Sequence, residues 1–346
     1  MRVLQIADFE ISDDSVPFVI AEVGHNHQGS IELCEKIFDA AANAGAHAVK
    51  LQKRFNKTLF TPDFFNSPYQ GPTSFGDSYG LHREALEFDF NQYKHLKNYA
   101  ESKGLIFFAT AFDFKSVDFL QKLGVPALKL ASGDLKSIPL IRYAQNTDLP
   151  LIISTGGSTW TDIDSAIASV IPKNVGILQC TAAYPAEAEN MDLKVIESMR
   201  KRYPETVVGL SSHDRGIAFS VVAAALGARI IEKHFTLDRS MKGTDHAFSL
   251  EPTGMSKLVR DLALVVRAIG DGEKKFHDVE KNGIRKMGKM LIFSRALPSG
   301  HVLTEDDLEI RSPMEGVSAG AWDSVIGRRL LQEVQALEPL RIENLE

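Results

Sequence analysis

The chain has 346 residues, a length that fits one large domain with a small one, or two domains of medium size. Of these residues 44% are hydrophobic and 24% are charged, which argues against a disordered or fibrous chain. The 39 Lys and Arg against 45 Asp and Glu leave a net charge of -6, without the basic excess that binding to a nucleic acid or an anionic membrane requires. We expect a folded, soluble protein with neither of these partners.

Cysteine usage and the start of the chain both favour a cytoplasmic protein. The two cysteines, Cys34 and Cys180, are too few to stabilise a chain of this length through disulfide bonds, so a reducing compartment is expected. Residues 1–8 end on the acidic Asp8 and do not begin the apolar core of a signal peptide, and no stretch approaches the roughly 18 apolar residues of a membrane span. We therefore predict a cytoplasmic location.

Short β-branched segments alternate with longer segments of helical periodicity, a pattern typical of parallel strands joined by helices. Strands are predicted at residues 17–22, 46–52, 105–110, 127–131, 151–154, 175–180, 206–211 and 229–234. Helices are predicted at residues 31–44, 92–103, 116–123, 139–146, 161–171, 193–202 and 218–226, with a last one over 255–269. Eight such units match a (β/α)8 TIM barrel, and a doubly wound open sheet, which normally has fewer strands, is the alternative.

Two regions depart from this regular pattern. Residues 53–87, rich in Phe, Pro, Gly, Ser and Tyr, form an insertion directly after the second predicted strand, where a long loop is expected to be functional. After residue 270 a charged stretch is followed by short strand-like pieces broken by turns. We predict a barrel domain over residues 1–270, a linker over 271–289 and a small β-rich domain over 290–346.

Polar residues stand at the ends of several predicted strands, where a barrel of this kind carries its active site. Lys50 and Lys129 lie within otherwise apolar strands, where a buried ammonium is costly unless it is paired or binds an anion. They favour a phosphate or carboxylate pocket. Hydroxyl groups of the neighbouring strand ends would complete it: Thr110, Ser132, Ser154 and Ser211. The alternatives are a structural ion pair of one lysine with Glu22 or Glu232, and a Schiff-base lysine.

His213 and His234 follow consecutive predicted strands, so their rings are expected to converge. A metal site and acid–base catalysis are equally open from this spacing. Carboxylates placed nearby favour an octahedral Mn²⁺ or Mg²⁺ over a closed zinc site: Glu22, Asp214, Glu232 and Asp245. His25 and His27 lie in a glycine-containing loop and are expected to contact the loop or solvent instead.

A series of motifs resembles the sialic acid synthases, which condense phosphoenolpyruvate with an N-acetylmannosamine-type sugar to a nine-carbon 2-keto acid. The motifs run in order along nearly the whole chain: IAEVGHNHQG (20–29), VKLQK (49–53), LKLASGD (128–134), STGG (154–157), LQCTAAYP (178–185), GLSSHD (209–214), EKHFTLD (232–238) and KGTDHAFSLEP (242–252). The tail resembles the antifreeze-like (SAF) domain of these enzymes, which caps the partner's site in a swapped dimer. The insertion at 74–88 resembles that of the animal-type 9-phosphate synthases, which points to a phosphorylated or otherwise altered sugar.

This resemblance implies roles for individual residues. It implies a Mn²⁺ (or Mg²⁺) cofactor held by His213 and His234. It implies catalytic roles for Glu22, Lys50, Lys129 and Asp245. It implies substrate-binding roles for Gln52, Thr110, Ser132, Ser154, Tyr184, Ser211, Glu232 and Phe235. The implied partners are phosphoenolpyruvate, an amino sugar or its 6-phosphate, and a second copy of the chain in a domain-swapped homodimer.

Two other functions compete with this interpretation. One is another carbon–carbon bond-forming barrel enzyme, either a Schiff-base aldolase using Lys129 or a 3-deoxy-octulosonate-type synthase. The other is a non-catalytic homologue that binds a sugar or an ion. The presence of Glu22, His213 and His234 argues against lost catalysis, because decay is expected to remove at least one of them.

Overall fold

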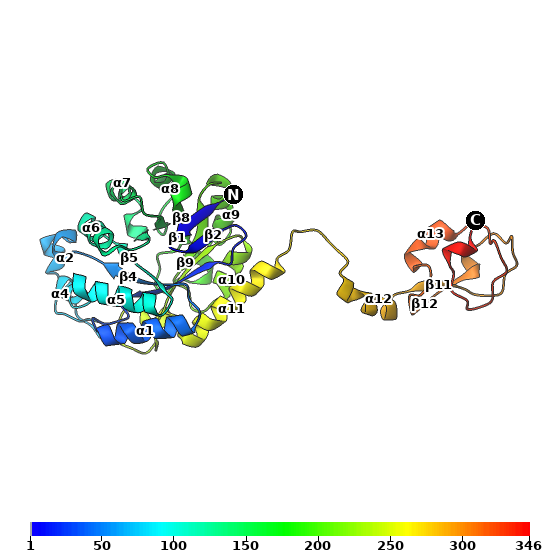
Figure 1. Ribbon diagram of the computed structural model, residues 1–346, viewed down its shortest axis with the longest axis horizontal. Helices are drawn as coiled ribbons and strands as arrows, with labels where there is room; N and C mark the ends of the chain where they lie inside the picture. Colours follow the sequence, from blue (N-terminus) through cyan, green and yellow to red (C-terminus); the bar gives the residue numbers. More distant parts are fainter. Residues whose placement is uncertain (1) are drawn as a thin grey trace. The chain divides into compact units, whose positions relative to one another are not determined.

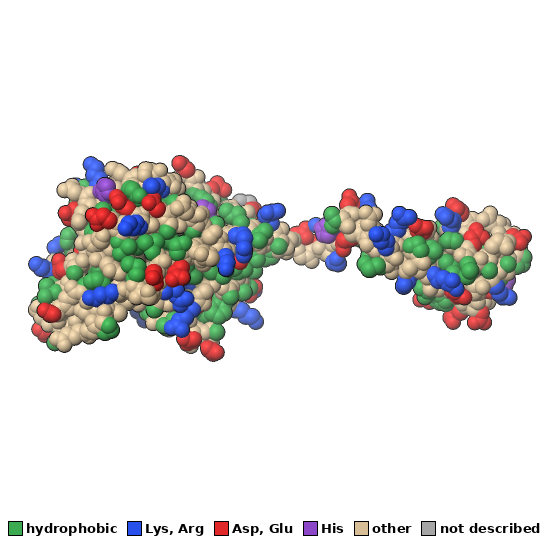
Figure 2. Space-filling model, turned by 90° about the horizontal axis from the view of Figure 1, so that it is seen from below, with side chains coloured by type: hydrophobic (Ala, Val, Ile, Leu, Met, Phe, Trp, Pro, Cys, Tyr) green, Lys and Arg blue, Asp and Glu red, His purple; other side chains and the backbone are tan. Residues whose placement is uncertain are grey.

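The computed structural model describes residues 2–346, which divide into two compact units. The first unit ends at Gly270, and the second runs from Asp271 to Glu346. In the first unit, helices surround a ring of strands (Figure 1). Charged side chains of both signs are intermixed on the face of this unit that Figure 2 presents. No helix among residues 2–346 has the length and apolar character needed to cross a bilayer.

The strands of the first unit form a closed barrel of eight parallel strands, which confirms the predicted fold and excludes the open sheet. The order around the barrel is β10-β3-β4-β5-β6-β7-β8-β9, so neighbours in sequence are neighbours in space. The strands are β3 (Phe18–Gly24), β4 (Ala48–Lys53), β5 (Ile106–Ala111), β6 (Leu128–Leu130), β7 (Leu151–Ser154), β8 (Val175–Cys180), β9 (Val207–Ser212) and β10 (Ile230–His234).

The helices that cover the barrel begin and end at local sequence signals. Ser30 caps the first of them, and Asp89 and Gln92 cap the start of another reciprocally. Gly124 ends a third with φ 73°, a left-handed conformation that costs glycine little. The covering helices are α1 (Ile31–Asn43), α5 (Phe90–Ser102), α6 (Phe114–Leu123), α7 (Ile138–Gln145), α8 (Trp160–Ile167), α9 (Val195–Arg202), α10 (Ala218–Ala225) and α11 (Pro252–Ala268). The insertion after β4 carries α2 (Asn56–Leu59), α3 (Pro62–Phe65) and α4 (Tyr79–Glu84).

A short antiparallel hairpin precedes the barrel, and the sequence pattern did not predict it. Its strands are β1 (Val3–Ile6) and β2 (Phe9–Ser12), each of four residues. Leu4, Ile6 and Ile11 are buried in the barrel core, and Leu4 reaches the amino end of β8 beside Gly176. The hairpin therefore packs at the amino end of the barrel, opposite the carboxyl ends of the strands.

Alternation along each strand decides which side chains face the barrel interior. On β10, Glu232 and His234 line a cavity at the carboxyl end of the barrel. Lys233 faces the other way and pairs with the buried Asp214 at 2.7 Å. The polar positions predicted from the sequence therefore gather at one end of the barrel.

The second unit has a separate hydrophobic core, formed around Leu291, Phe293 and Val334. Its strands β11 (Met290–Phe293) and β12 (Leu308–Arg311) pair antiparallel, and α13 (Trp322–Val325) follows them. The segment predicted as a linker contains a helix, α12 (Lys281–Met287). Hydrophobic side chains lie among charged ones on the visible face of this unit (Figure 2).

Candidate active site

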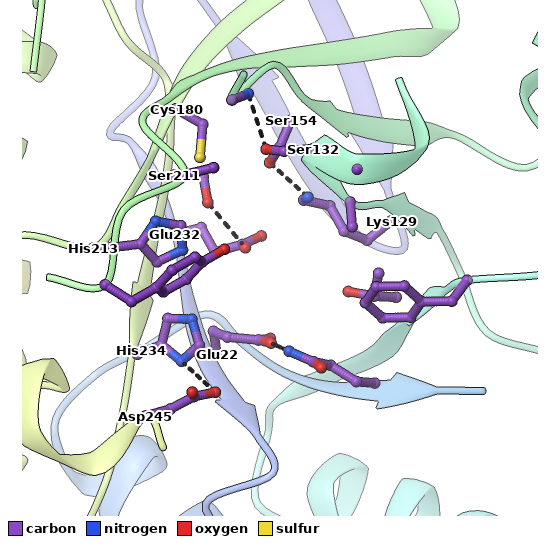
Figure 3. Close-up of a pocket in the computed structure, with 18 of the residues that line it drawn as sticks. Glu22, Lys129, Ser132, Ser154, Cys180, Ser211, His213, Glu232, His234 and Asp245 are labelled. Atoms are coloured by element: carbon purple, nitrogen blue, oxygen red, sulfur yellow. Dashed lines mark hydrogen bonds and ion pairs between the residues drawn. The ribbon is translucent and has the colours of Figure 1, made fainter. Parts of the chain in front are cut away.

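A cavity of about 770 Å³ opens at the carboxyl ends of the barrel strands. Figure 3 shows its polar side chains pointing inward from the surrounding strands. Nearly all residues that the sequence singled out line it: Glu22, Lys50, Gln52, Thr110, Lys129, Ser132, Ser154, Tyr184, Ser211, His213, Glu232, His234 and Asp245. The structure thus brings together groups that are spread over more than two hundred positions of the chain.

Phe235 is the exception, and its predicted place beside the sugar is wrong. It directly follows His234, so alternation turns its side chain away from the cavity. The side chain is fully buried in the hydrophobic core. Only its backbone takes part in positioning the site, because its N–H donates to the carbonyl of Glu22 at 2.8 Å.

Lys50 is paired with carboxylates, as the ion-pair alternative predicted. Its Nζ lies 2.6 Å from Glu22 Oε2 and 3.7 Å from Glu232 Oε1, and it donates to Thr110 Oγ1 at 2.7 Å. Gln52 donates to the other oxygen of Glu22 at 2.6 Å. Lys50 and both carboxylates are almost completely buried, so their mutual attraction is little screened by water.

The two carboxyl groups have different protonation preferences. Burial and the charge of Glu232 raise the pKa of Glu22 to about 7, against the opposing effect of Lys50. Although burial opposes ionisation of Glu232 as well, Lys129 and Lys50 hold its pKa below the ordinary value. Carboxyl groups whose pKa values are pushed apart in this way can divide the roles of proton carrier and fixed charge. Glu22 is therefore the better candidate for a group that exchanges a proton near neutral pH.

Lys129 differs from Lys50, because no carboxylate among residues 2–346 lies within ion-pair distance of it. Its ammonium is 2% exposed and donates only to Ser154 Oγ at 2.6 Å and to the Leu130 carbonyl at 2.9 Å. Burial lowers the pKa of Lys129 from its ordinary value. A buried cation with neutral partners creates a site that an anion would stabilise.

The loop after β7 supplies further donors beside Lys129. Gly156 N–H donates to Ser132 Oγ at 2.9 Å, and Gly156, Gly157 and Ser158 line the cavity. A Cβ on Gly156 would come within 2.8 Å of Ser132 Oγ, so a side chain here would displace that hydroxyl. Lysine, hydroxyls and a glycine loop together have the composition of a phosphate or carboxylate site.

His213 and His234 face each other with ring centroids 5.3 Å apart (Figure 3). His213 Nδ1 donates to the Thr181 carbonyl at 3.0 Å, so Nε2 keeps a lone pair. His234 Nδ1 has no hydrogen-bond partner and lies 3.6 Å from Asp245 Oδ2. Burial, then the neighbouring His234, lowers the pKa of His213 to about 4, so its ring is neutral at pH 7.

These side chains fit a loosely held divalent ion better than a closed metal site. A neutral imidazole whose other nitrogen is engaged, as in His213, is a typical ligand, and the buried Glu232 Oε2 is without a hydrogen-bond partner. Asp214 does not line the cavity, and its Oδ1 accepts from Lys233 and Ser212. Within residues 2–346 no group of three or more His, Cys, Asp and Glu side chains is placed to hold an ion by itself. Water and substrate oxygens would have to complete the coordination, as they commonly do for Mg²⁺.

Several lining residues were not predicted. Arg54 continues the alternation of Lys50 and Gln52 on β4, so the sequence contained a signal for it. Arg83 comes from the insertion, where no periodicity indicates a direction. Cys180 ends β8 at the cavity wall. The remaining unpredicted lining residues include Phe112, Lys136 and Thr244.

A model of the NeuB family matches residues 37–274, and a model of the SAF domain matches residues 288–346. The N-acetylneuraminate-9-phosphate synthase of Homo sapiens is 36% identical over 321 residues, which cover 92% of this chain and 89% of that protein. The chain therefore belongs to the NeuB family.

Two further relatives extend this comparison. The N,N'-diacetyllegionaminic acid synthase of Campylobacter jejuni is 34% identical over 317 residues, covering 90% of this chain and 94% of that protein. The crystal structure of an N-acetylneuraminic acid synthetase from Leptospira borgpetersenii matches with a TM-score of 0.72 and 30% identity. That match covers 82% of this chain and 95% of the other.

Proposed function

We propose that this protein condenses phosphoenolpyruvate with an N-acetylmannosamine-type sugar, or its 6-phosphate, to a nine-carbon 2-keto acid and phosphate. The observation that carries the proposal is the buried ammonium of Lys129, which has no carboxylate within ion-pair distance and lies in the same cavity as Glu22 and two facing histidines. The curated relatives named above are synthases of N-acetylneuraminate 9-phosphate and diacetyllegionaminic acid, which supports the same class of reaction here.

Phosphoenolpyruvate would bind with an anionic group against Lys129. The hydroxyls of Ser132 and Ser154 and the N–H groups of the loop at Gly156 would share its negative charge. Lys50 and Thr110 lie on the adjacent strands and would contact a second anionic group of the same molecule. Because every one of these groups is held by strand or loop backbone, little reorganisation would be needed on binding.

The reaction balances with one water molecule. C3 of phosphoenolpyruvate forms a bond to the aldehyde carbon of the open-chain sugar, and the aldehyde oxygen takes up a proton. Water adds to C2 and loses one proton, which leaves a hydroxyl on C2. The bond between C2 and the phosphate oxygen then breaks, the departing phosphate takes up the proton of that hydroxyl, and the keto group remains. Glu22, with a pKa near 7, is the group in this cavity suited to receive the proton from water. Gln52 and Lys50 hold its carboxylate in place at 2.6 Å each.

His213 and His234 would hold a Mn²⁺ or Mg²⁺ ion, which when bound supplies Lewis-acid polarisation of the aldehyde oxygen. Thr181 fixes the tautomer of His213 by accepting from Nδ1, and Asp245 faces Nδ1 of His234. Tyr184 packs against the His213 ring at 4.2 Å between centroids and so restricts its rotation. These contacts orient both rings toward the cavity.

We further propose a cytoplasmic homodimer in which the SAF unit of one chain covers the barrel of its partner. Exposed apolar side chains of that unit support an association, because Leu331, Leu337 and Ile342 are each more than half exposed. Light scattering after gel filtration tests this state. A mass of twice 38.2 kDa is expected, and a single chain's mass would contradict it.

Phosphate release from phosphoenolpyruvate tests the proposed function. With Mn²⁺ present, release is expected only when N-acetylmannosamine or its 6-phosphate is added, and a chelator should abolish it. Borohydride added with substrate should leave activity intact, because the synthase forms no imine. Borohydride inactivation with a label on Lys129 would instead support the Schiff-base aldolase. The absence of phosphate release by a folded, Mn²⁺-loaded protein with either sugar would contradict the proposal.

A further inference from the structure

The loop after β3 contains a buried asparagine that has no role in the reaction described above. Asn26 is 1% exposed, and its neighbours His25 and His27 are buried as well. His27 Nδ1 accepts from the Gly29 N–H at 3.1 Å within the loop, whereas His25 lies 3.1 Å from Arg54 Nη1 rather than in solvent. The loop is therefore held in place on both sides of Asn26.

The hydrogen bonds of Asn26 fix the orientation of its side chain. Its Nδ2 donates to the Phe235 carbonyl at 2.9 Å and to Ser249 Oγ at 3.0 Å. A carbonyl oxygen only accepts, so the amide nitrogen must face Phe235. Ser249 donates its single hydroxyl proton to the Asp245 carbonyl at 2.6 Å, and it therefore accepts from Asn26. Both amide protons are thus committed to one arrangement.

The two acceptors of Asn26 belong to the segments that carry His234 and Asp245. Phe235 directly follows His234 at the end of β10, and Ser249 follows Asp245 by four residues in the next loop. Asn26 comes from a third segment and bonds to both. Loss of its amide would leave a buried carbonyl and a buried hydroxyl without this donor, and the two segments could then shift apart.

The separation of His234 and Asp245 is the property that these hydrogen bonds set. His234 Nδ1 and Asp245 Oδ2 lie 3.6 Å apart (Figure 3), which is too far for a hydrogen bond. Within residues 2–346 His234 Nδ1 has no hydrogen-bond partner. The two side chains are therefore held at this distance by the segments behind them. Gly24 limits the same space, since a Cβ there would come within 3.6 Å of Asp245 Oδ2.

We propose that Asn26 is a positioning residue of the divalent-ion site. Through Phe235 and Ser249 it keeps His234 and Asp245 at a fixed separation, and so it sets the affinity for Mn²⁺. This inference rests on the proposed function and deepens its metal site, because Asn26 does not line the cavity. Loss of a group that orients metal ligands typically lowers metal affinity by roughly 10- to 100-fold.

Mn²⁺ binding to the full chain, freed of metal by a chelator and desalted, tests this role. Electron paramagnetic resonance of free Mn²⁺ gives the Kd without any turnover. Asn26→Leu removes the amide at similar volume and should raise the Kd roughly 10- to 100-fold. The matched control is Asn56→Leu, which should leave the Kd at the wild-type value. Asn56 is also 1% exposed and follows the next strand, but neither of its amide atoms has a hydrogen-bond partner among residues 2–346.

A milder pair of variants decides the question if Asn26→Leu does not fold. Ser249→Ala removes only the hydroxyl between Asn26 and Asp245, and it should raise the Kd by a smaller factor. Its control is Ser220→Ala, because Ser220 is fully buried in α10 and its hydroxyl has no partner in the described chain, residues 2–346. In all four variants the KM for phosphoenolpyruvate at saturating Mn²⁺ should stay at the wild-type value, since Lys129 and its partners are untouched.

The outcomes separate this inference from the proposed function. An unchanged Kd in folded Asn26→Leu and Ser249→Ala, or an equal loss in their controls, would overturn the positioning role and leave the synthase intact. A raised KM for phosphoenolpyruvate would show a general loosening of the barrel and would overturn it too. Phosphate release by a wild type that binds no Mn²⁺ would refute this inference and retain the condensation. The expected Kd values in a protein that releases no phosphate would refute the proposed function but support the role of Asn26.

Discussion

Replacing Lys129 by methionine should affect function and stability in opposite directions. Methionine keeps much of the side-chain volume but removes the ammonium that donates to Ser154 and to the Leu130 carbonyl. A hydrogen bond to a charged group contributes about 1.5–3 kcal/mol, so kcat/KM for phosphoenolpyruvate should fall roughly 10- to 150-fold. Because burial lowers the pKa of Lys129, its charge opposes folding at neutral pH. The free energy of unfolding should therefore stay within about 1 kcal/mol of wild type, or rise.

Lys233 provides the matched control for this variant. It is also a buried lysine of a barrel strand, but it pairs with Asp214 at 2.7 Å on the outer side of β10. Lys233→Met leaves that buried carboxylate without its counter-charge and should cost about 3–5 kcal/mol of unfolding free energy. Urea denaturation gives the stabilities, and phosphate release at varied phosphoenolpyruvate gives kcat/KM. Lys129→Met with normal phosphoenolpyruvate saturation, or with a loss of stability like that of Lys233→Met, would refute the anion site.

The roles of Glu22, of the two histidines and of the second unit can each be tested separately. Glu22→Gln should lower kcat by about 10²- to 10⁴-fold, and the wild-type rate should rise with pH through about 7, because the carboxylate is the active form. Since the pKa of Glu22 is raised from 4.5 to about 7, the protonated group stabilises the fold below pH 4.5. This part of the unfolding free energy should be lost as the pH rises from 4.5 to 7, in urea titrations of the wild type but not of the variant. His213→Ala and His234→Ala should each abolish turnover with little change in unfolding, and an undiminished wild-type rate in metal-depleted buffer would contradict the metal assignment. A chain ending at Gly270 should unfold cooperatively in calorimetry, because the two units have separate cores. The same chain should show no turnover, and full activity would contradict a role for the second unit.

The barrel could be predicted because hydrophobic periodicity and strand length repeat eight times along the chain. The same regularity placed Glu22, Lys129 and His213 at one end of the barrel, since parallel strands align their carboxyl ends. The hairpin before the barrel was missed because two strands of four residues are too short to establish a period.

Individual contacts in the site were harder to predict than its location. The spacing of residues in the sequence does not show whether Lys50 or Lys129 forms an ion pair with a carboxylate. That pairing depends on how far the side chains reach across three strands. Phe235 was misplaced because a family motif does not state which way each of its residues faces. Arg83 belongs to an irregular insertion, where only the folded chain brings it to His25.

The fate of the bridging oxygen of phosphoenolpyruvate tests the central claim most directly. The enzyme would be supplied with phosphoenolpyruvate carrying ¹⁸O between C2 and phosphorus, together with Mn²⁺ and N-acetylmannosamine or its 6-phosphate. Mass spectrometry should find a nine-carbon 2-keto acid without label and phosphate that retains the ¹⁸O. Label left in the keto acid, or no condensation product with either sugar, would contradict the account.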